Sequence, residues 1–297
     1  MTSRMLQHPR FVPVLPSVYR HETHELTPPD WVRAAELTLP PDAVVSHQTR
    51  FVRLGLVQGD LFPLHFTVGR DLHLPDLPRI FLHRTLRMPR CTDAGVQLAT
   101  ALIGTAAELP LIDVVCAGDW LLHRGLLRLD SLRRTLVLEH WRPGAPAARQ
   151  AADLLRSCSR SPMESQVRCL LVAAGLPEPE SNADVVDADG QFLACADLYY
   201  RWLRLLIEYE GRQHALDAAQ FQRDILRYAR LRDQGYAYVQ VTQAMAASPR
   251  VLVETIHRSM RAAGYDGPAP RFGSAWAAML TAPAPWQHHP RRSRGAA

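Results

Sequence analysis

Residues 197–227 carry the side chains of this 297-residue chain that are best suited to chemistry. Asp197 ends one predicted strand, and Glu208 and Glu210 end the next. Carboxylate oxygens are the preferred ligands of hard divalent cations. Acids gathered at strand ends and followed at once by a histidine, His214, therefore indicate a divalent-metal site.

The strand that ends at Glu210 has two acids on one face. Side chains alternate along a strand, so Glu208 and Glu210 point the same way and repel each other unless a cation or a proton lies between them. Asp197 is close to both only if the antiparallel pairing of the two strands brings it opposite the Glu208 end. The sequence leaves that register open.

Glu164 is a further acid in an apolar setting. It lies three residues before Val167 and seven before Leu171, so it faces the apolar side of its predicted helix. A carboxylate there is costly unless it is paired or bound to metal. The alternative is an exposed ion pair with Arg168 at i,i+4, worth only about 0.3–0.5 kcal/mol.

Asp224 and Arg227 have the i,i+3 spacing of helix neighbours. They form either a surface ion pair or an acid near the metal beside an arginine that grips a phosphate. His214 is either a neutral loop residue or a general acid and base. The arginines expected to contact phosphate are Arg168, Arg212 and Arg227.

The elements that must position these residues follow one another regularly. The N-cap signal Ser161-Pro162 predicts a helix over 161–175. Apolar alternation predicts the strands 183–187, 192–199, 202–209 and 236–242, and helical periodicity predicts the helices 217–234 and 249–263. The order is αβββαβα, so we predict a mixed α/β (α+β) domain over 155–264.

The first half of the chain predicts a smaller mixed α/β domain over 27–145, which ends in a Pro- and Gly-rich linker at 140–150. Its predicted elements are helices at 27–39, 41–55, 91–107, 110–124 and 129–138 and strands at 62–68 and 79–84. Residues 1–26 are expected to be irregular, and 265–297 a disordered basic tail. Arg50 and Arg53 belong either to a winged-helix-like DNA reader or to a solvated arginine face.

Composition is consistent with a polyanionic partner in the cytoplasm. The formal charge is +5, the isoelectric point is about 9.2, and all 34 basic residues are arginine. Five scattered cysteines without CxxC spacing indicate reduced thiols rather than disulfides or a zinc knuckle. No run of about 18 apolar residues predicts a membrane span.

The motifs in residues 155–264 resemble a known family. They are Glu164 in SPMESQVR, Asp197, the run IEYEGRQH from Ile207 to His214, and DILRYARL with Asp224, Arg227 and Leu231. Their order is similar to the endonuclease-like domains related to very-short-patch mismatch repair endonucleases, within the restriction-endonuclease-like PD-(D/E)xK superfamily.

That resemblance implies a hydrolase that cleaves DNA phosphodiester bonds with Mg²⁺ or Mn²⁺. Asp197 and Glu208 would hold the metal, and Glu164 would help position metal or water. The sequence departs from the pattern in two places. Glu210 stands where the superfamily has its lysine, and Gln240 stands where an arginine is common.

The segments AVVSHQTRFVRLGL, PLHFTV and IFLHR resemble the start of abortive-infection-type antitoxins. This implies that the N-terminal domain binds DNA or a protein partner. Two other hypotheses stay open. The chain is a non-catalytic DNA-binding or antitoxin-like regulator that keeps a nuclease fold, or its acids and arginines only form a buried ion-pair network.

Overall fold

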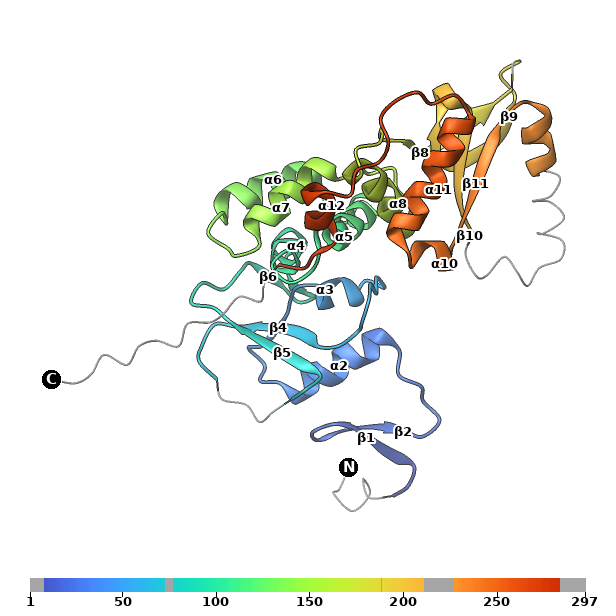
Figure 1. The fold of residues 1–297 in the computed structure, drawn as a ribbon. Helices are drawn as coiled ribbons and strands as arrows, with labels where there is room; N and C mark the ends of the chain where they lie inside the picture. Colours follow the sequence, from blue (N-terminus) through green and yellow to red (C-terminus); the bar gives the residue numbers. More distant parts are fainter. Residues whose placement is uncertain (1–7, 73–76, 188, 211–226, 284–297) are drawn as a thin grey trace. The chain divides into compact units, whose positions relative to one another are not determined.

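The computed structural model describes residues 8–72, 77–187, 189–210 and 227–283. The chain divides into two compact units, and both combine helices with strands (Figure 1). Unit 1 comprises residues 1–109, 130–150 and 282–297, and unit 2 comprises 110–129 and 151–281. The predicted mixed α/β class is therefore confirmed.

Unit 1 is built around a three-stranded sheet and one helix. The helix α2 (Pro28–Thr38) begins at Thr27, whose side chain and that of Asp30 cap each other's backbone N–H groups. The sheet has the order β3 (Val44–Val45), β4 (Leu64–Val68), β5 (Ile80–Arg84). Leu64 and Phe66 of β4 pack with Val32 and Ala35 of α2 in one apolar core.

Several predictions for unit 1 are wrong. A hairpin of β1 (Phe11–Leu15) and β2 (Val18–His21) replaces the irregular start, and β3 with α3 (Thr49–Val52) replaces one long helix. The hairpin of β6 (Cys91–Thr92) and β7 (Gly95–Val96) precedes α4 (Leu98–Thr105), and Gly95, which follows the turn at 93–94, has a positive φ that suits glycine. Further along are α6 (Leu129–Leu138) and, in place of the linker, α7 (Ala145–Leu154).

The sheet of unit 1 also differs from a winged helix. The wing of that fold is an antiparallel hairpin, whereas β4 and β5 run parallel, with Leu64 opposite Ile80 and Val68 opposite Arg84. Arg50 is buried and donates to the carbonyl oxygen of Val96. It therefore does not belong to a solvated arginine face.

Unit 2 contains a four-stranded mixed sheet in the order β11-β10-β9-β8. The strand β10 runs parallel to β11 and antiparallel to β9, and β9 runs antiparallel to β8. In chain order the elements are α5 (Leu111–His123), α8 (Pro162–Ala173), β8 (Glu180–Val186), β9 (Phe192–Tyr200), β10 (Leu205–Glu210), a helix at 227–233, β11 (Ala237–Thr242), α10 (Gln243–Ala246), α11 (Pro249–Ala262) and α12 (Ser274–Leu280). From α8 to α11, the predicted elements occur within a few residues of their expected bounds.

The last part of unit 2 contains the helix α12, so the prediction of a disordered tail is wrong over residues 265–281. Trp276 and Met279 of α12 are buried, and the Arg271 backbone N–H donates to the Ala174 carbonyl oxygen at the end of α8. The burial of these two large apolar side chains accounts for a helix in a segment otherwise rich in proline and alanine.

No helix in the described ranges has the length and apolarity that a bilayer crossing requires. The longest of them, α11, has 14 residues, and its exposed face carries charged side chains. A spanning helix needs about 20 apolar residues.

A buried ion pair joins α5 to α8 and explains why residues 110–129 belong to unit 2, outside the single boundary predicted at 140–150. Arg168 donates to Asp119 at 2.8 Å, and both side chains are at most 1% exposed. Arg168 also donates to Glu178 at 2.9 Å. Asp119 accepts from the hydroxyl of Ser165 and the backbone N–H of Arg156 as well. These bonds offset the cost of burying the two charges.

We predict that Asp119→Ala lowers the free energy of unfolding by about 3–5 kcal/mol, because the buried Arg168 guanidinium loses the carboxylate that neutralises it. Urea unfolding followed by circular dichroism measures the change. Glu254→Ala is the matched control, since its ion pair with Arg250 on α11 is solvent-exposed. It should shift stability by less than about 1 kcal/mol. Equal effects of both variants would contradict the prediction.

Candidate functional site

The register of β9 and β10 answers the question that the sequence left open. Leu206 pairs with Tyr199 and Ile207 with Leu198, so the next step along the same register sets Glu208 beside Asp197. On the other side of β10, Gln240 of β11 lies opposite Glu208. The two acids therefore come together at the point where β9 and β10 separate.

The fourth strand extends this arrangement. In the β8–β9 pairing, Ser181 faces Leu198 and Ala183 faces Ala196, so Asn182 lies level with Asp197. Asn182 has a φ of 49°, in the left-handed region that asparagine tolerates better than most residues. Four residues, one from each strand, therefore form a line across the sheet. We call this set, Asn182, Asp197, Glu208 and Gln240, the acid row.

Glu208 is almost fully buried, with 6% of its surface exposed. Its Oε2 accepts from Tyr228 Oη at 2.6 Å and from Arg227 at 2.7 Å, whereas Oε1 has no hydrogen-bond partner among the described residues. Burial raises the pKa of this carboxyl, and the nearby Asp197 charge raises it further, against the opposing effects of Tyr228 and Arg227. A buried acceptor without a partner is costly, and a bound cation would satisfy it.

Asp197 is held by the backbone. Its Oδ2 accepts from the Tyr209 N–H at 2.8 Å, which fixes the carboxylate beside the end of β10. Burial raises the pKa of Asp197, and the charge of Glu164 raises it further, while the Tyr209 N–H and Arg227 lower it. A neighbouring carboxylate therefore raises the pKa of each acid, Glu164 that of Asp197 and Asp197 that of Glu208.

Glu164 lies in the first turn of α8, where the Ser161 hydroxyl caps the helix. Its carboxylate is buried and accepts from the Arg160 backbone N–H at 2.8 Å and from Asn182 Nδ2 at 2.5 Å. The exposed Glu164–Arg168 pair considered from the sequence is therefore wrong. Glu164 instead links α8 to the acid row through Asn182.

Arg168 lies away from the acid row, in the pair with Asp119 described above. Its guanidinium is 1% exposed and held by two carboxylates, which leaves it no surface for a phosphate. The expectation that Arg168 contacts DNA is thus at odds with its position, and we assign it to the core of unit 2.

The helix at 227–233 supplies two side chains to Glu208. The sequence analysis named one of them, Arg227, but as a phosphate contact or a partner of Asp224. Arg227 binds Glu208, and its side chain is 32% exposed. Tyr228 was missed. Its ring stacks on Tyr238 of β11 with centroids 4.4 Å apart, which aims the hydroxyl at Glu208. The adjacent Arg-Tyr pair in DILRYARL, one turn before the buried Leu231, was the available signal.

Other predicted site residues are outside what the structure describes. Arg212, His214 and Asp224 lie outside the described residues, so their roles stay predictions. Glu210 is the last residue of β10, opposite Thr242 of β11.

The described acids do not by themselves form a three-ligand cage. No three described acids bring carboxylate oxygens within 4.8 Å of one another, so Glu164, Asp197 and Glu208 do not meet this spacing. The pair Asp197 and Glu208 is the part that suits a metal, because Mg²⁺ is usually held by one or two carboxylates plus waters and a substrate phosphate. Glu164 contacts the acid row through its hydrogen bond with Asn182.

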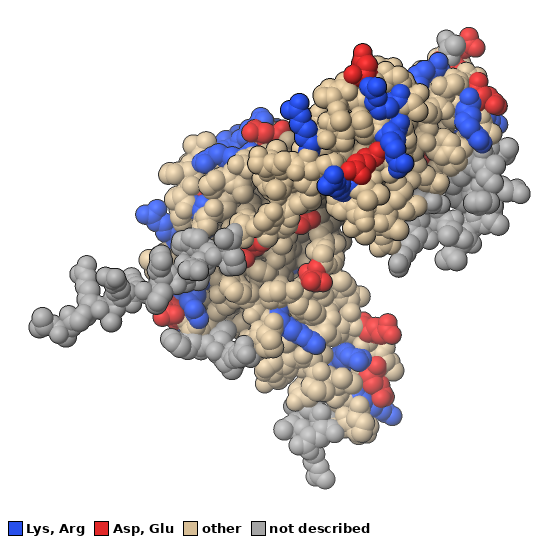
Figure 2. Space-filling view, in the orientation of Figure 1, with Lys and Arg blue, Asp and Glu red and all other residues tan. Residues whose placement is uncertain are grey.

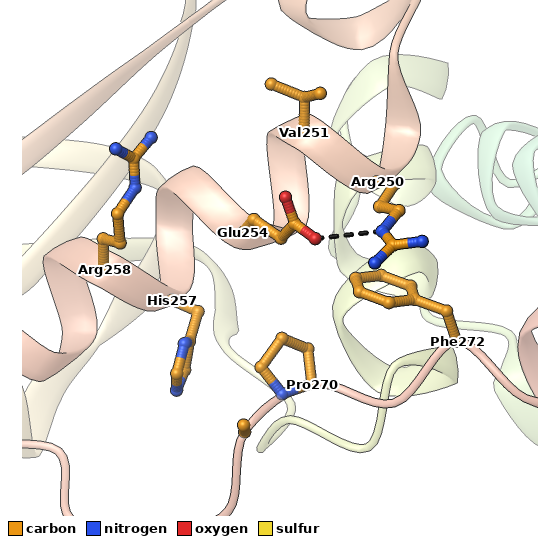
Figure 3. A pocket seen from close by; sticks show the side chains of 8 residues that line it. Arg250, Val251, Glu254, His257, Arg258, Pro270 and Phe272 are labelled. Carbon is orange, nitrogen blue, oxygen red and sulfur yellow. Dashed lines mark hydrogen bonds and ion pairs between the residues drawn. The ribbon is translucent and has the colours of Figure 1, made fainter.

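A surface pocket of unit 2 is separate from the acid row. It lies between α11 and residues 269–272 and is lined by Arg250, Glu254, His257 and Phe272, among others (Figure 3). Arg250 and Glu254 neutralise each other there at 2.9 Å. On the face shown in Figure 2, arginines likewise lie next to acids. That face therefore presents no unbroken basic surface for a polyanion.

Comparison with known proteins gives relatives but no class. The chain is 28% identical over 156 residues to two curated Mycobacterium tuberculosis proteins, named uncharacterized protein MT2308 (strain CDC 1551 / Oshkosh) and uncharacterized protein Rv2248 (strain ATCC 25618 / H37Rv). The alignment covers 49% of this chain and 55% of each relative, so the chain spans about half the length of the relatives it matches. No family model and no solved structure matches.

We predict that Tyr228→Phe raises the pKa of Glu208 and destabilises unit 2 by about 1–3 kcal/mol, because a buried carboxylate loses a donor. NMR titration of ¹³C-labelled glutamate side chains measures the pKa, and urea unfolding measures stability. The control is Tyr238→Phe, which keeps the stacked ring pair and the bond to Glu208. An unchanged Glu208 pKa in Tyr228→Phe would show that the hydroxyl does not bind it.

Proposed function

We propose that the chain is a metal-dependent DNA endonuclease whose active site is the acid row. The observation that carries the proposal is the pair Asp197 and Glu208 on neighbouring strands, with the buried Oε1 of Glu208 lacking a partner. The element order from α8 to α11 and the mixed sheet support a restriction-endonuclease-like fold for unit 2. Mg²⁺ or Mn²⁺ is the expected cofactor and DNA the expected substrate.

The donor set fits Mg²⁺. Asp197 and Glu208 supply two carboxylates, and each already has a protein donor on one oxygen, which orients it and leaves the other oxygen for a metal. When bound there, the ion supplies positive charge that polarises a phosphate and lowers the pKa of a coordinated water.

The residues of the chain position these groups. The Tyr209 N–H holds Asp197, Tyr228 and Arg227 hold Glu208, and Glu164 holds Asn182 at the end of the row. Arg227 brings a guanidinium to Glu208, and guanidinium groups bind phosphate with the same fork geometry that they use for a carboxylate. Gln240 is exposed beside Glu208 and reaches the same side of the row.

One observation favours a second function. Arg227 already neutralises Glu208 at 2.7 Å, as a metal would. On that ground the alternative is a non-catalytic DNA-binding or antitoxin-like protein that keeps a nuclease fold. Such a protein binds DNA in a salt-dependent way and cleaves none.

We predict that the full chain nicks supercoiled plasmid in the presence of Mg²⁺ or Mn²⁺ but not of EDTA. Asp197→Ala and Glu208→Ala should each lower the cleavage rate by at least about 100-fold, since several kcal/mol of charge stabilisation is lost. The matched control is Asp184→Asn, which changes an exposed carboxylate on β8 of the same sheet. Binding of plasmid without any cleavage supports the second function. Cleavage that survives in Asp197→Ala points to a different site.

A second prediction follows from the raised pKa of Asp197. Because its pKa is higher in the folded chain than in the unfolded chain, the folded state binds more protons between the two values, and stability falls as pH rises through that interval. The Asp197→Asn variant has no carboxyl at this position and so does not lose stability in this way as the pH rises. In EDTA, its stability relative to the unmodified chain should therefore increase from pH 4 to pH 7, as measured by urea unfolding. Added Mg²⁺ should stabilise the unmodified chain more than the variant. A relative stability that falls with pH would refute the assignment.

A further inference from the structure

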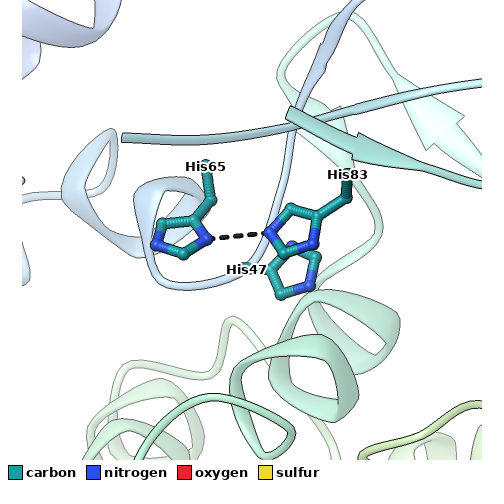
Figure 4. Close-up of side chains that lie close together, drawn as sticks. All are labelled: His47, His65 and His83. Carbon is teal, nitrogen blue, oxygen red and sulfur yellow. Dashed lines mark hydrogen bonds between the residues drawn. The ribbon is translucent and has the colours of Figure 1, made fainter. Parts of the chain in front are cut away.

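Three histidines of unit 1 gather their ring nitrogens in one place. His47 follows β3, His65 lies on β4 and His83 on β5, and one ligand atom from each lies within 4.8 Å of the others (Figure 4). They are separated by 18 residues along the chain at each step. Among the described residues, this is the set of three or more metal-binding side chains with that spacing.

The pairing of β4 and β5 accounts for two of them. His83 lies opposite Thr67, and His65 precedes Thr67 by two residues, so both imidazoles project from the same face of the sheet. The other face of β4 carries Leu64 and Phe66, which form the apolar core with α2. The histidine face is therefore a second, polar layer of unit 1.

His47 is brought to this face by an unusual backbone. Its φ is 50°, in the left-handed region, which costs a residue with a Cβ about 1–2 kcal/mol. Its ring lies against Gly104 of α4, where a Cβ would come within 2.8 Å of both Cδ2 and Nε2. Strained backbone of this kind gathers at functional sites, where the surrounding structure enforces it.

The hydrogen bonds of the cluster leave one polar atom unexplained. His65 Nδ1 lies 2.8 Å from His83 Nε2, and His65 Nε2 lies 2.6 Å from Gln48 Nε2. The Oε1 of Gln48 is buried without a partner. The two ends of an amide are assigned from such networks. If they are exchanged, Oε1 accepts from His65 Nε2–H, and the amide nitrogen takes the buried position that has no partner among the described residues.

That exchange changes what His65 offers to its neighbours. With its proton on Nε2, His65 turns the lone pair of Nδ1 towards His83. Donation of one ring N–H to an amide or carboxylate oxygen, with the other nitrogen free, is the usual state of a metal-binding histidine. His47 has a similar partner, since its Nδ1 lies 2.9 Å from the Ser46 hydroxyl, which in turn accepts from Thr67.

Burial also favours the neutral form of two of the rings, those of His65 and His47. Burial lowers the pKa of His65 to about 4. Burial lowers the pKa of His47 as well, and His83, His65 and Arg142 lower it further. A neutral imidazole has one lone pair for a metal. The proton in the hydrogen bond between His65 Nδ1 and His83 Nε2 moves to His83 Nδ1 or to solvent when both nitrogens bind the metal.

We propose that His47, His65 and His83 form a binding site for a divalent transition-metal ion of the zinc class, with a fourth position for water or another ligand. Imidazole nitrogens select Zn²⁺, Cu²⁺ or Ni²⁺ over Mg²⁺, and three histidines with an open position are a known zinc ligand set. The site differs from the acid row in both its unit and its ligand type. Two nitrogens bound to a tetrahedral zinc at about 2.0–2.1 Å lie about 3.3 Å apart. Metal binding would therefore lengthen the distance between His65 Nδ1 and His83 Nε2, now 2.8 Å, by about half an ångström.

Zinc binding by the full chain tests the proposal. The chain is freed of metal with a chelator, and Zn²⁺ alone is titrated into it by calorimetry. We expect one ion per chain, and at least tenfold weaker binding in His83→Ala and in His47→Ala. The matched control His24→Ala removes an exposed histidine of the same unit and should bind as the unmodified chain does. Circular dichroism confirms that each variant is folded.

A second measurement needs no variant. Co²⁺ in place of zinc should give visible absorption bands of a tetrahedral or five-coordinate site, and Zn²⁺ should shift the NMR signals of these three imidazoles only. His83 is half-buried, so His83→Ala is the variant expected to keep the fold if His65→Ala does not. Absence of zinc and cobalt binding by the folded unmodified chain would overturn the proposal and leave a stacked, hydrogen-bonded histidine cluster. Equal zinc affinity in the folded His83→Ala chain would overturn it too.

Discussion

The pairing register between β9 and β10 is the constraint on which the candidate site depends. A shift by one residue would turn every side chain of β10 to the opposite face, because alternation along a strand has a period of two. Buried side chains hold the register, among them Leu206 beside Tyr199 and Ile207 beside Leu198. The apolar residues of the two strands thereby determine where their acids lie, and the helix at 227–233 then supplies the hydroxyl and the guanidinium that hold Glu208.

The C-terminal elements could be predicted from the sequence because their signals are local. Ser161 with Pro162 marks the start of α8, and alternation marks the strands. The partners of the acids could not be predicted in the same way. Tyr228 reaches Glu208 across 20 residues and Asn182 reaches Glu164 across 18, and such pairs depend on tertiary packing. Arg168 was misplaced for the same reason, since its partner Asp119 lies on a helix that the sequence assigned to the other domain. In unit 1, short strands and turns around glycines were read as helix, because brief apolar runs do not distinguish the two.

The acid pair and the histidine cluster differ in what the surrounding structure has to provide. Asp197 and Glu208 are acids whose burial favours the protonated form, so the ionised pair is a source of instability that a hard cation would relieve. Burial favours the neutral form of His47 and His65 without any cation, and the left-handed backbone of His47 and the absence of a side chain at Gly104 make room for the cluster. The difference follows from the donors. Buried carboxylates are charged and need a cation nearby, whereas neutral imidazoles need only have their nitrogens held at the right positions for a metal. The histidines lie on a polar face of their sheet, whereas Glu208 and Asp197 share a face with the buried Leu206 and Tyr199.

The buried pair of Asp119 and Arg168 also bears on how the chain is made. The two residues are separated by 49 positions. During synthesis at about 5–20 residues per second, the carboxylate on α5 leaves the ribosome roughly 2–10 s before its guanidinium partner. Throughout this interval Asp119 of α5 has no guanidinium partner, while residues 130–150, which belong to the other unit, are synthesised. The nascent chain therefore cannot finish its two units one after the other, and unit 2 closes only when α8 arrives.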